Sequence, residues 1–239
     1  MIALDYTFEN PNANLAFDEV LLRDAERESS DDVLRFWEST TPFVVLGLTQ
    51  RINDVVYVDR CTEDAIPITR RCSAGGCVLQ GPGCLNFTLI LAKNRHPQII
   101  SIQNSYDYIL NRIIDALPEY DLNRAGISDI ALGDLKVSGN AQRRHKNYIL
   151  HHGTILYDTD IQQVSRYLKE PKDRPDYRGT RSHEKFVSNL ATSRESLMET
   201  IRTIFECEAA TNSPRRDILK EAAELAQTKY DKQAWIYRK

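Results

Sequence analysis

The sequence predicts one α/β (α+β) domain over residues 1–239, built as a mixed β-sheet flanked by helices. Segments rich in β-branched and aromatic residues dominate the first two-thirds of the chain, whereas helical periodicity dominates its end. With 41% hydrophobic and 27% charged residues, the chain has enough apolar side chains for a sizeable core. No linker marks a second domain, and no internal repeat is visible.

The first predicted element is a helix over 12–27, which Asn12 or Asn14 can cap. Its apolar residues recur at helical spacing above an acidic outer face: Ala16, Val20 and Leu21. The next two segments, 33–39 and 43–48, are rich in β-branched and aromatic residues and are separated by a short turn. They are predicted to form a β-hairpin.

Short strands are predicted at 68–73 and 78–81, on either side of a pair of glycines. The continuous apolar run 84–92 is typical of a strand buried on both faces. Residues 101–117 form a predicted amphipathic helix that ends before Pro118. Its apolar residues recur at intervals of three and four: Ile102, Tyr106, Ile109, Ile113 and Leu117.

Three more strands are predicted at 129–132, 135–144 and 148–157, and a polar turn joins the last two as a hairpin. The segment 169–184 is dense in charge and contains two prolines and a glycine, so a long mobile loop is expected.

Two helices are predicted toward the end of the chain. Thr192 and Glu195 form a capping box for the first, and the second follows Pro214. Their apolar residues recur at helical spacing: Leu197, Ile201, Ile204 and Phe205 in the first, Ile218, Ala222 and Leu225 in the second.

Composition excludes several classes of function. A net charge of −3 argues against a protein that mainly coats nucleic acid or an anionic membrane. No apolar run approaches a membrane span, and the N-terminus lacks the basic start and apolar stretch of a signal peptide, so we expect a cytoplasmic protein. The five cysteines show no C-x-x-C or zinc-type spacing, so we expect reduced thiols that act as small buried hydrophobes.

The segment 70–78, RRCSAGGCV, places two arginines before the pair Gly75 and Gly76. Paired glycines let a backbone approach an anion closely, and the guanidinium of a preceding arginine can bind phosphate or carboxylate. No G-K-[ST] follows, and the glycines do not open a helix, so neither a P-loop nor a dinucleotide fingerprint is present. A tight turn without a ligand is the competing interpretation.

A second candidate lies on the predicted strand 135–144, where Lys136 and Ser138 are two positions apart and should share one face. Gly139 would leave room for a ligand beside them, although a solvated lysine on an edge strand is the favoured interpretation of this segment taken by itself. His151 and His152 lie on opposite faces of the next strand, so they cannot both bind one metal. We expect one to face a pocket and the other the core or solvent.

Taken in order, these segments resemble the motif series of the lipoate–protein ligase A family. The resemblance is carried by NLAFDEVLL, FVVLGLTQ, RRCSAGGCV, DIALGDLKVSGNAQ, HHGTIL and the terminal KYDKQAWIYRK. It implies the catalytic-domain fold shared by biotin ligases, lipoate–protein ligases and octanoyltransferases, with the acyl chain held in a tunnel.

The resemblance also implies roles for individual residues. Lys136 matches the family's invariant catalytic lysine, Arg71 its nucleotide-contacting arginine, and Asp129 an aspartate near Mg²⁺ and phosphate. The remaining residues match the glycine-rich loop and the strands that bind ATP, adenylate and lipoate: Gly75, Gly76, Cys77, Val78, Leu79, Ser138, Gly139, Ala141, His152, Gly153 and Thr154. The chain departs from the family pattern at Ala74, Cys77 and Ser128.

The implied activity is that of a lipoate–protein ligase with ATP and Mg²⁺ as cofactors and lipoate as substrate. Lipoate is activated to lipoyl-AMP, and the lipoyl group then passes to a lysine of an acceptor protein. The implied acceptors are lipoyl domains of 2-oxoacid dehydrogenase acyltransferases, the glycine-cleavage H protein or a dedicated lipoate-binding protein. A fixed cation suits this chemistry, because charge develops on the phosphate and on the carbonyl oxygen.

Two other functions compete with ligation. An octanoyltransferase needs a nucleophilic cysteine, and no cysteine lies between Cys84 and Cys207, where relatives with that activity carry theirs. A non-catalytic lipoyl-protein binder would not need Lys136, Arg71 or the glycine pair. The residues do not choose between lipoate and octanoate, since both are short apolar acids.

Many ligases of this family carry a small accessory domain after the tryptophan segment, and this chain ends four residues past Trp235. Either a separate small subunit or the charged loop 169–184 is therefore expected to assist adenylation. That loop offers four basic residues that could close over phosphates: Lys172, Arg174, Arg178 and Arg181.

Overall fold

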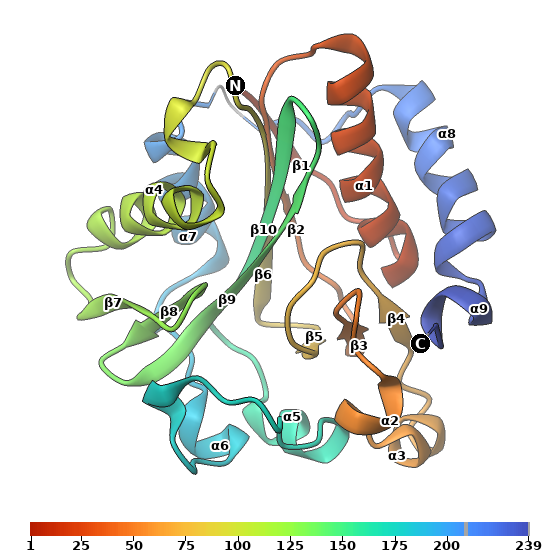
Figure 1. The fold of residues 1–239 in the computed structure, drawn as a ribbon, viewed down its shortest axis with the longest axis vertical. Helices are drawn as coiled ribbons and strands as arrows, with labels where there is room; N and C mark the ends of the chain where they lie inside the picture. Colours follow the sequence, from red (N-terminus) through yellow and green to blue (C-terminus); the bar gives the residue numbers. More distant parts are fainter. Residues whose placement is uncertain (208–209, 239) are drawn as a thin grey trace.

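The computed structural model describes residues 1–207 and 210–238 and contains a seven-stranded mixed sheet (Figure 1). Strands β1 and β2 are parallel, whereas the remaining neighbours in the sheet are antiparallel. In spatial order the strands are β1 (Ile2–Asp5), β2 (Val33–Trp37), β6 (Cys84–Ala92), β10 (Tyr148–Leu156), β9 (Leu135–Arg144), β8 (Asp129–Leu132) and β7 (Leu122–Ala125).

Helices cover both faces of this sheet, as Figure 1 shows. Helices α1 (Pro11–Glu28) and α8 (Arg216–Leu225) pack on one face, and α4 (Ile102–Asp115) and α7 (Arg194–Ile204) on the other. Strand β6, at the centre, is buried along its whole length, as its continuous apolar run predicts. The predicted fold class, a mixed sheet flanked by helices, is therefore confirmed.

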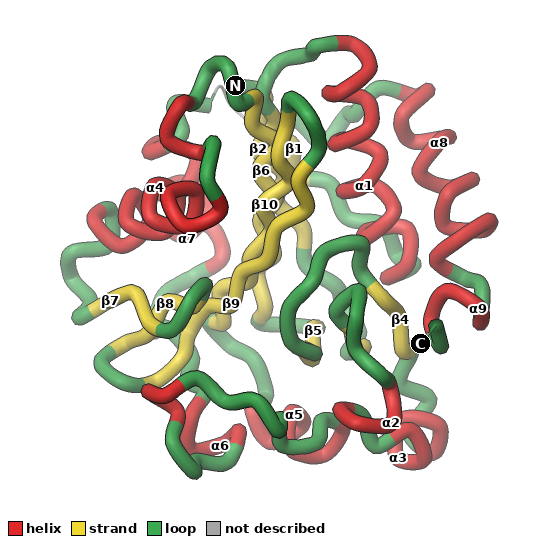
Figure 2. The backbone as a smooth tube through the Cα atoms, viewed as in Figure 1, coloured by secondary structure: helices red, strands yellow, loops and turns green. Residues whose placement is uncertain are grey.

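The predicted hairpin over 33–48 is wrong. Strand β2 has both edges occupied, by β1 and β6, so no edge is left for the segment that follows it. Strand β3 (Phe43–Leu46) instead forms the middle of a separate three-stranded sheet, between β4 (Ile68–Arg70) and β5 (Val78–Gln80). The tube in Figure 2 shows β4 and β5 of this small sheet near the start of α1, where Leu15 and Ala16 pack with Phe43 of β3. By contrast, the predicted hairpin of β9 and β10 is confirmed.

Two predicted helix caps are displaced. Asn10 caps α1, because Pro11 takes the first helical position and the Asn10 side chain accepts from the Asn12 amide. Ser193 caps α7 through the Ser196 amide, so Thr192 and Glu195 form no capping box. The last predicted helix, α8, continues into a π-helical turn, Ala226–Tyr230.

Short elements complete the described chain. They are α2 (Ile52–Val55), α3 (Val58–Glu63), a 3₁₀ turn at Pro97–Ile99, α5 (Ile161–Tyr167), a 3₁₀ turn at Asp176–Arg178, α6 (His183–Phe186) and α9 (Gln233–Ile236). The segment predicted as the loop 169–184 therefore contains a 3₁₀ turn and the start of α6. Among the described residues, no helix is long and apolar enough to cross a membrane.

Asp32 ties the start of β2 to the end of β6. Its carboxylate accepts from the Ala92 amide at 2.9 Å, from Arg95 at 2.7 Å, and lies 2.6 Å from Nε2 of His96. Burial alone would raise the pKa of Asp32, but these partners outweigh burial and lower that pKa to about 2.

The folded-state pKa of Asp32 lies below the ordinary value of 3.8, so its contribution to stability is fully present above about pH 4. It should be lost as the pH falls toward about 2. We predict that Asp32→Asn lowers stability at pH 7 and flattens the decline of stability in this acid range. Urea unfolding of both proteins across the range measures this, and parallel pH profiles would contradict it.

Candidate active site

A pocket follows one row of residues across five neighbouring strands. Trp37 of β2 pairs with Asn86 of β6, Asn86 with Thr154 of β10, Thr154 with Gly139 of β9, and Gly139 with Asp129 of β8. Cross-strand partners lie on the same face of a sheet, and all five residues line the pocket. Since neighbouring strands are about 4.8 Å apart, the row is about 19 Å long. The pocket floor is therefore long enough for an extended chain with a larger group at one end.

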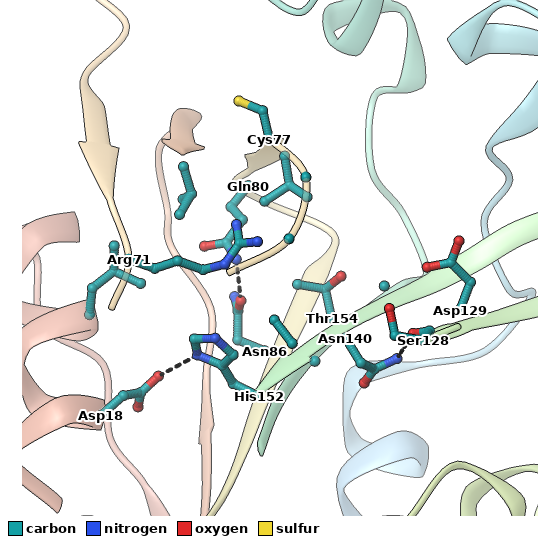
Figure 3. Close-up of a pocket in the computed structure, with 18 of the residues that line it drawn as sticks. Asp18, Arg71, Cys77, Gln80, Asn86, Ser128, Asp129, Asn140, His152 and Thr154 are labelled. Atoms are coloured by element: carbon teal, nitrogen blue, oxygen red, sulfur yellow. Dashed lines mark hydrogen bonds and ion pairs between the residues drawn. The ribbon is translucent and has the colours of Figure 1, made fainter. Parts of the chain in front are cut away.

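Elements on the far side of the cleft form the opposite wall. They are helix α1, strands β3 and β5, and the loop 71–77 between β4 and β5 (Figure 3). The residues that they contribute are Leu15, Asp18, Val45, Arg71, Gly75, Gly76, Cys77, Val78 and Gln80. Because Asp129 and Lys136 lie at one end of the row and Trp37 at the other, we call these the lysine end and the tryptophan end.

Most residues singled out in the sequence come together in this pocket. Those that line it are Arg71, Gly75, Gly76, Cys77, Val78, Asp129, Lys136, Gly139, Ala141, His152, Gly153 and Thr154. Leu79 does not, because alternation along β5 turns it into the apolar cluster of the small sheet. Ser138 is also buried away from the pocket lining, where its hydroxyl accepts from the Asn140 amide at 3.1 Å.

Lys136 and Ser138 do not share a face, contrary to the sequence-based expectation. Ser138 pairs with Ile130 and Lys136 with Ala131, so β9 carries one extra residue, Val137, opposite β8. This bulge breaks the alternation of side chains. The Lys136 ammonium lies over Gly139, where an added Cβ would be 3.0 Å from Nζ. Gly139 thus leaves room for the lysine of its own strand.

The carboxylate of Asp129 is engaged on both oxygens. Oδ1 lies 2.8 Å from the Lys136 ammonium, and Oδ2 accepts from the Tyr177 hydroxyl at 2.8 Å. Burial and the neighbouring Asp129 charge raise the pKa of Tyr177, so its hydroxyl stays protonated. Over residues 1–207 and 210–238, no group of three or more His, Cys, Asp or Glu side chains is placed to hold a metal.

The four basic residues of the loop 169–184 do not line the pocket. Each is paired with a carboxylate: Lys172 with Asp54, Arg174 and Arg178 with Glu170, and Arg181 with Asp134. The loop contacts the pocket residue Asp129 through the hydroxyl of Tyr177, not through a basic side chain.

A chain of buried polar groups lies behind the glycine loop. Asp18 holds Arg35 at 2.6 Å and accepts from Thr88 at 2.9 Å, and its Oδ2 is 3.6 Å from Nδ1 of His152 (Figure 3). His152 lies 2.5 Å from the Ser73 hydroxyl through Nε2. The Arg71 guanidinium donates to the same hydroxyl at 3.0 Å, so the serine hydrogen is left for His152.

The protonation states follow from burial and from these partners. Burial lowers the pKa of His152 in spite of Asp18 beside it, which keeps the imidazole neutral at pH 7. For Asp18, burial would raise the pKa, but Arg35 and His152 together hold it below its usual value. Burial lowers the pKa of Arg71 to about 10, so its guanidinium is still charged. Ser73 is buried and does not line the pocket. The hydrogen-bonded series from Asp18 to Arg71 therefore positions the glycine loop and supplies no nucleophile.

The two histidines face opposite sides of β10, as predicted. His152 lines the pocket, whereas His151 is fully buried against Phe87 and Tyr106 on the other side. Burial lowers the pKa of His151 to about 3. His151 is therefore a neutral core residue at pH 7.

The cysteines are all free thiols, and four of them are buried as expected, whereas Cys77 is half-buried and lines the pocket. Burial raises the pKa of Cys72, Cys77 and Cys84 to about 12 in each case. A thiolate is needed for nucleophilic attack, so none of these three is activated at pH 7.

Sequence reasoning missed several pocket residues, among them Asp18, Trp37, Gln80, Asn86 and Asn140. Asp18 lies inside a segment that resembles a family motif, but its acidic neighbours on the helix suggested a solvated face. Gln80 and Asn86 are hydrogen-bonded across the short turn between β5 and β6, but neither residue carries a local signal of a pocket.

Comparison with known proteins gives one family. Residues 10–209 match the model of the lipoyl protein ligase A/B catalytic domain. A lipoate-protein ligase of Bacillus subtilis is 26% identical over 95% of this chain and 70% of its own length. A lipoate–protein ligase of Staphylococcus aureus is 28% identical over the same shares of the two chains, 95% and 70%.

Solved structures show the same fold. A lipoate-protein ligase A with bound ATP superposes with a TM-score of 0.83 at 22% identity, covering 99% of both chains. A Thermoplasma acidophilum protein with bound lipoic acid gives a TM-score of 0.81 at 21% identity, covering 99% of this chain and 98% of that one. A bi-partite lipoate protein ligase of the same organism, described with its E2 lipoyl domain, gives 0.82 at 21% identity over 99% and 96%.

The glycine loop rests directly on the end of β3. A Cβ at Gly47 would lie 1.9 Å from the Gly75 carbonyl oxygen, whereas a Cβ at Gly76 would meet nothing within 4 Å. We predict that Gly47→Ala displaces the loop and costs on the order of 1–3 kcal/mol of stability. Gly76→Ala is the matched control and should change the unfolding midpoint little. Equal midpoints for the two variants in urea would contradict this packing.

Proposed function

The chain belongs to the family of lipoyl protein ligase A/B catalytic domains, and we propose that it activates lipoate with ATP and lipoylates an acceptor lysine. Curated relatives over most of the chain are named lipoate-protein ligases, and structural relatives hold lipoic acid or ATP. The observation that carries the proposal is the pair of Lys136 and Asp129 at one end of a pocket about 19 Å long.

In the first step a carboxylate oxygen of lipoate attacks the α-phosphorus of ATP. The bond from that phosphorus to the bridging oxygen breaks, pyrophosphate leaves, and lipoyl-AMP remains. Both reactants are anions, so a fixed cation is needed where they meet. The Lys136 ammonium supplies it, with Arg71 and the backbone of the glycine loop on the opposite wall of the pocket.

In the second step the neutral amine of an acceptor lysine attacks the lipoyl carbonyl carbon. An amide forms, AMP leaves with the electron pair of the acyl–oxygen bond, and the amine loses its proton. No protein nucleophile takes part, so catalysis depends on positioning and on stabilising charge at the carbonyl oxygen and phosphate. The Lys136 ammonium would serve both steps once it leaves Asp129 for the bound anion.

Mg²⁺ does not fit a preformed protein site here. Asp129 is the sequence-predicted ligand; in this arrangement its two oxygens contact Lys136 and Tyr177, so it would be available to a metal ion only after the Lys136 ammonium moves to the bound anion. Mg²⁺ in nucleotide enzymes is commonly held through substrate phosphates with one or two carboxylates. We therefore derive no step through the metal from this chain.

A lipoyl domain is the proposed acceptor, since one structural relative is described together with an E2 lipoyl domain. We do not extend the proposal to a separate accessory subunit. Octanoyl transfer through an acyl-cysteine is disfavoured, because the pKa of Cys77, the cysteine that lines the pocket, is raised to about 12.

We predict that Lys136→Ala slows pyrophosphate release from lipoate and ATP about a hundred- to a thousandfold while leaving the fold intact. The control is Lys146→Ala, which removes an exposed lysine of the β9–β10 turn. Pyrophosphate release, circular dichroism and transfer of the lipoyl group to an apo lipoyl domain, followed by mass, are measured for each protein. Near wild-type transfer by Lys136→Ala from pre-made lipoyl-AMP would contradict the assigned role.

A further inference from the structure

His151 is a fully buried polar side chain to which the proposed reaction gives no role. Its ring centroid lies 5.9 Å from that of Phe87 and 5.6 Å from that of Tyr106, on the side of β10 away from the pocket. Both ring nitrogens are nonetheless engaged. Nδ1 is 3.1 Å from the side-chain nitrogen of Gln142, and Nε2 is 3.2 Å from the side-chain oxygen of Asn140. A histidine that is buried in an apolar core and hydrogen-bonded on both sides joins two other polar groups through the core.

The direction of these hydrogen bonds is fixed from the end farthest from the pocket. Arg144 has only donors, so the Gln142 atom that lies 3.0 Å from its guanidinium is the amide oxygen. The Gln142 nitrogen therefore faces His151 and donates to Nδ1, which leaves the imidazole hydrogen on Nε2. Nε2 then donates to the Asn140 oxygen, and the Asn140 nitrogen points onward. Burial lowers the pKa of His151 to about 3, so the neutral imidazole that this arrangement needs is present at pH 7.

This series of hydrogen bonds ends at the residue before Asp129. The Asn140 amide donates to the Ser128 carbonyl oxygen at 2.9 Å, as Figure 3 shows. Backbone pairing between β8 and β9 starts only at Asp129, so the Asn140 side chain anchors the last residue of the turn 126–128. Ser128 is followed directly by Asp129, whose carboxylate holds the Lys136 ammonium at 2.8 Å.

Gly153 provides the space that the Asn140 amide occupies. The two residues are cross-strand partners, and an added Cβ at Gly153 would lie 1.9 Å from Oδ1 of Asn140. Any larger residue at this position would therefore displace the amide from His151. The glycine that follows the two histidines thus fits the same series of hydrogen bonds.

Resting on the proposed function, we propose that His151 positions the catalytic lysine from behind the sheet. It acts through Asn140 on the Ser128 carbonyl. The position of that carbonyl then determines where Asp129 holds the Lys136 ammonium. A misplacement of about 1 Å at a reacting group can cost about a hundredfold in rate. Loss of the His151 hydrogen bonds should therefore lower kcat, whereas substrate binding, which depends on the rest of the pocket, should change little.

The kinetic test uses two variants that interrupt the series at different points. His151→Phe keeps an aromatic ring and removes both hydrogen bonds, whereas Asn140→Leu keeps the branched shape and removes the amide. Each should lower kcat for pyrophosphate release about ten- to a hundredfold. The KM values of His151→Phe for lipoate and ATP should stay within about twofold of those of the unchanged chain.

The matched control is Ile149→Val, which shortens a buried apolar side chain two positions away on the same face of β10. It should lower the unfolding midpoint in urea without lowering kcat. A fall in kcat equal to that of His151→Phe overturns the proposal, because a core defect alone would then explain both results.

A double-mutant cycle tests whether His151 acts through Asp129. In an Asp129→Asn background the ammonium has already lost its anchor, so adding His151→Phe should change kcat by less than about twofold. Equal losses of kcat in the two backgrounds overturn the proposal, since a general loss of order lowers kcat whatever residue stands at 129.

Two measurements on the full chain do not depend on turnover. Proton–nitrogen NMR should show His151 as the neutral Nε2–H tautomer, its signal being assigned by its loss in His151→Phe. Hydrogen exchange followed by mass should be faster in the turn 126–128 of His151→Phe than in that of Ile149→Val. If the unchanged chain releases no pyrophosphate, the proposed function fails, and these two results still decide whether His151 holds the turn. The Nδ1–H tautomer, or equal exchange in the two variants, overturns the inference.

Discussion

The pocket depends on the contacts that the buried carboxylate of Asp18 makes with Arg35, Thr88 and His152. Asp18 is 1% exposed and joins helix α1 to three strands, through Arg35 of β2, Thr88 of β6 and His152 of β10. A buried charge is tolerated only when it is paired and hydrogen-bonded, and Asp18 has both kinds of partner. Through His152 and Ser73 the same carboxylate fixes the start of the glycine loop. Buried hydrogen bonds thus hold the glycine loop, which forms part of the pocket wall, in place.

The register of five strands then divides the pocket into two chemically different ends. The row from Trp37 to Asp129 carries a cation at one end and neutral polar groups at the other. A substrate acid with a reactive carboxylate and a weakly polar distal end matches this order. The extra residue Val137 completes the lysine end, because the bulge lets Lys136 fold back over Gly139.

Local patterns in the sequence were enough for the fold class and for part of the pocket, and the resemblance to a known family supplied Asp129, Ala141, Gly153 and Thr154. Periodicity identified the main helices and strands, and Lys136, Arg71 and the glycine pair were found from their motifs. The displaced helix caps are local errors, whereas the errors in strand pairing are long-range. Strand β3 cannot pair with β2, because β1 and β6 occupy both edges of β2. No local pattern in the sequence predicts that β1 takes one of these edges. The bulge at Val137 likewise depends on β8, and it reversed the expected faces of Lys136 and Ser138.

The most direct test of this account is a crystal structure of the chain with a non-hydrolysable analogue of lipoyl-AMP. The account predicts that the analogue lies along the row, with its dithiolane against Trp37 and its phosphate beside Lys136. It also predicts that the Lys136 ammonium leaves Asp129, from which it is now 2.8 Å away, and contacts the phosphate or carbonyl oxygen. A reversed orientation, or an analogue bound while Lys136 still pairs with Asp129, would contradict it.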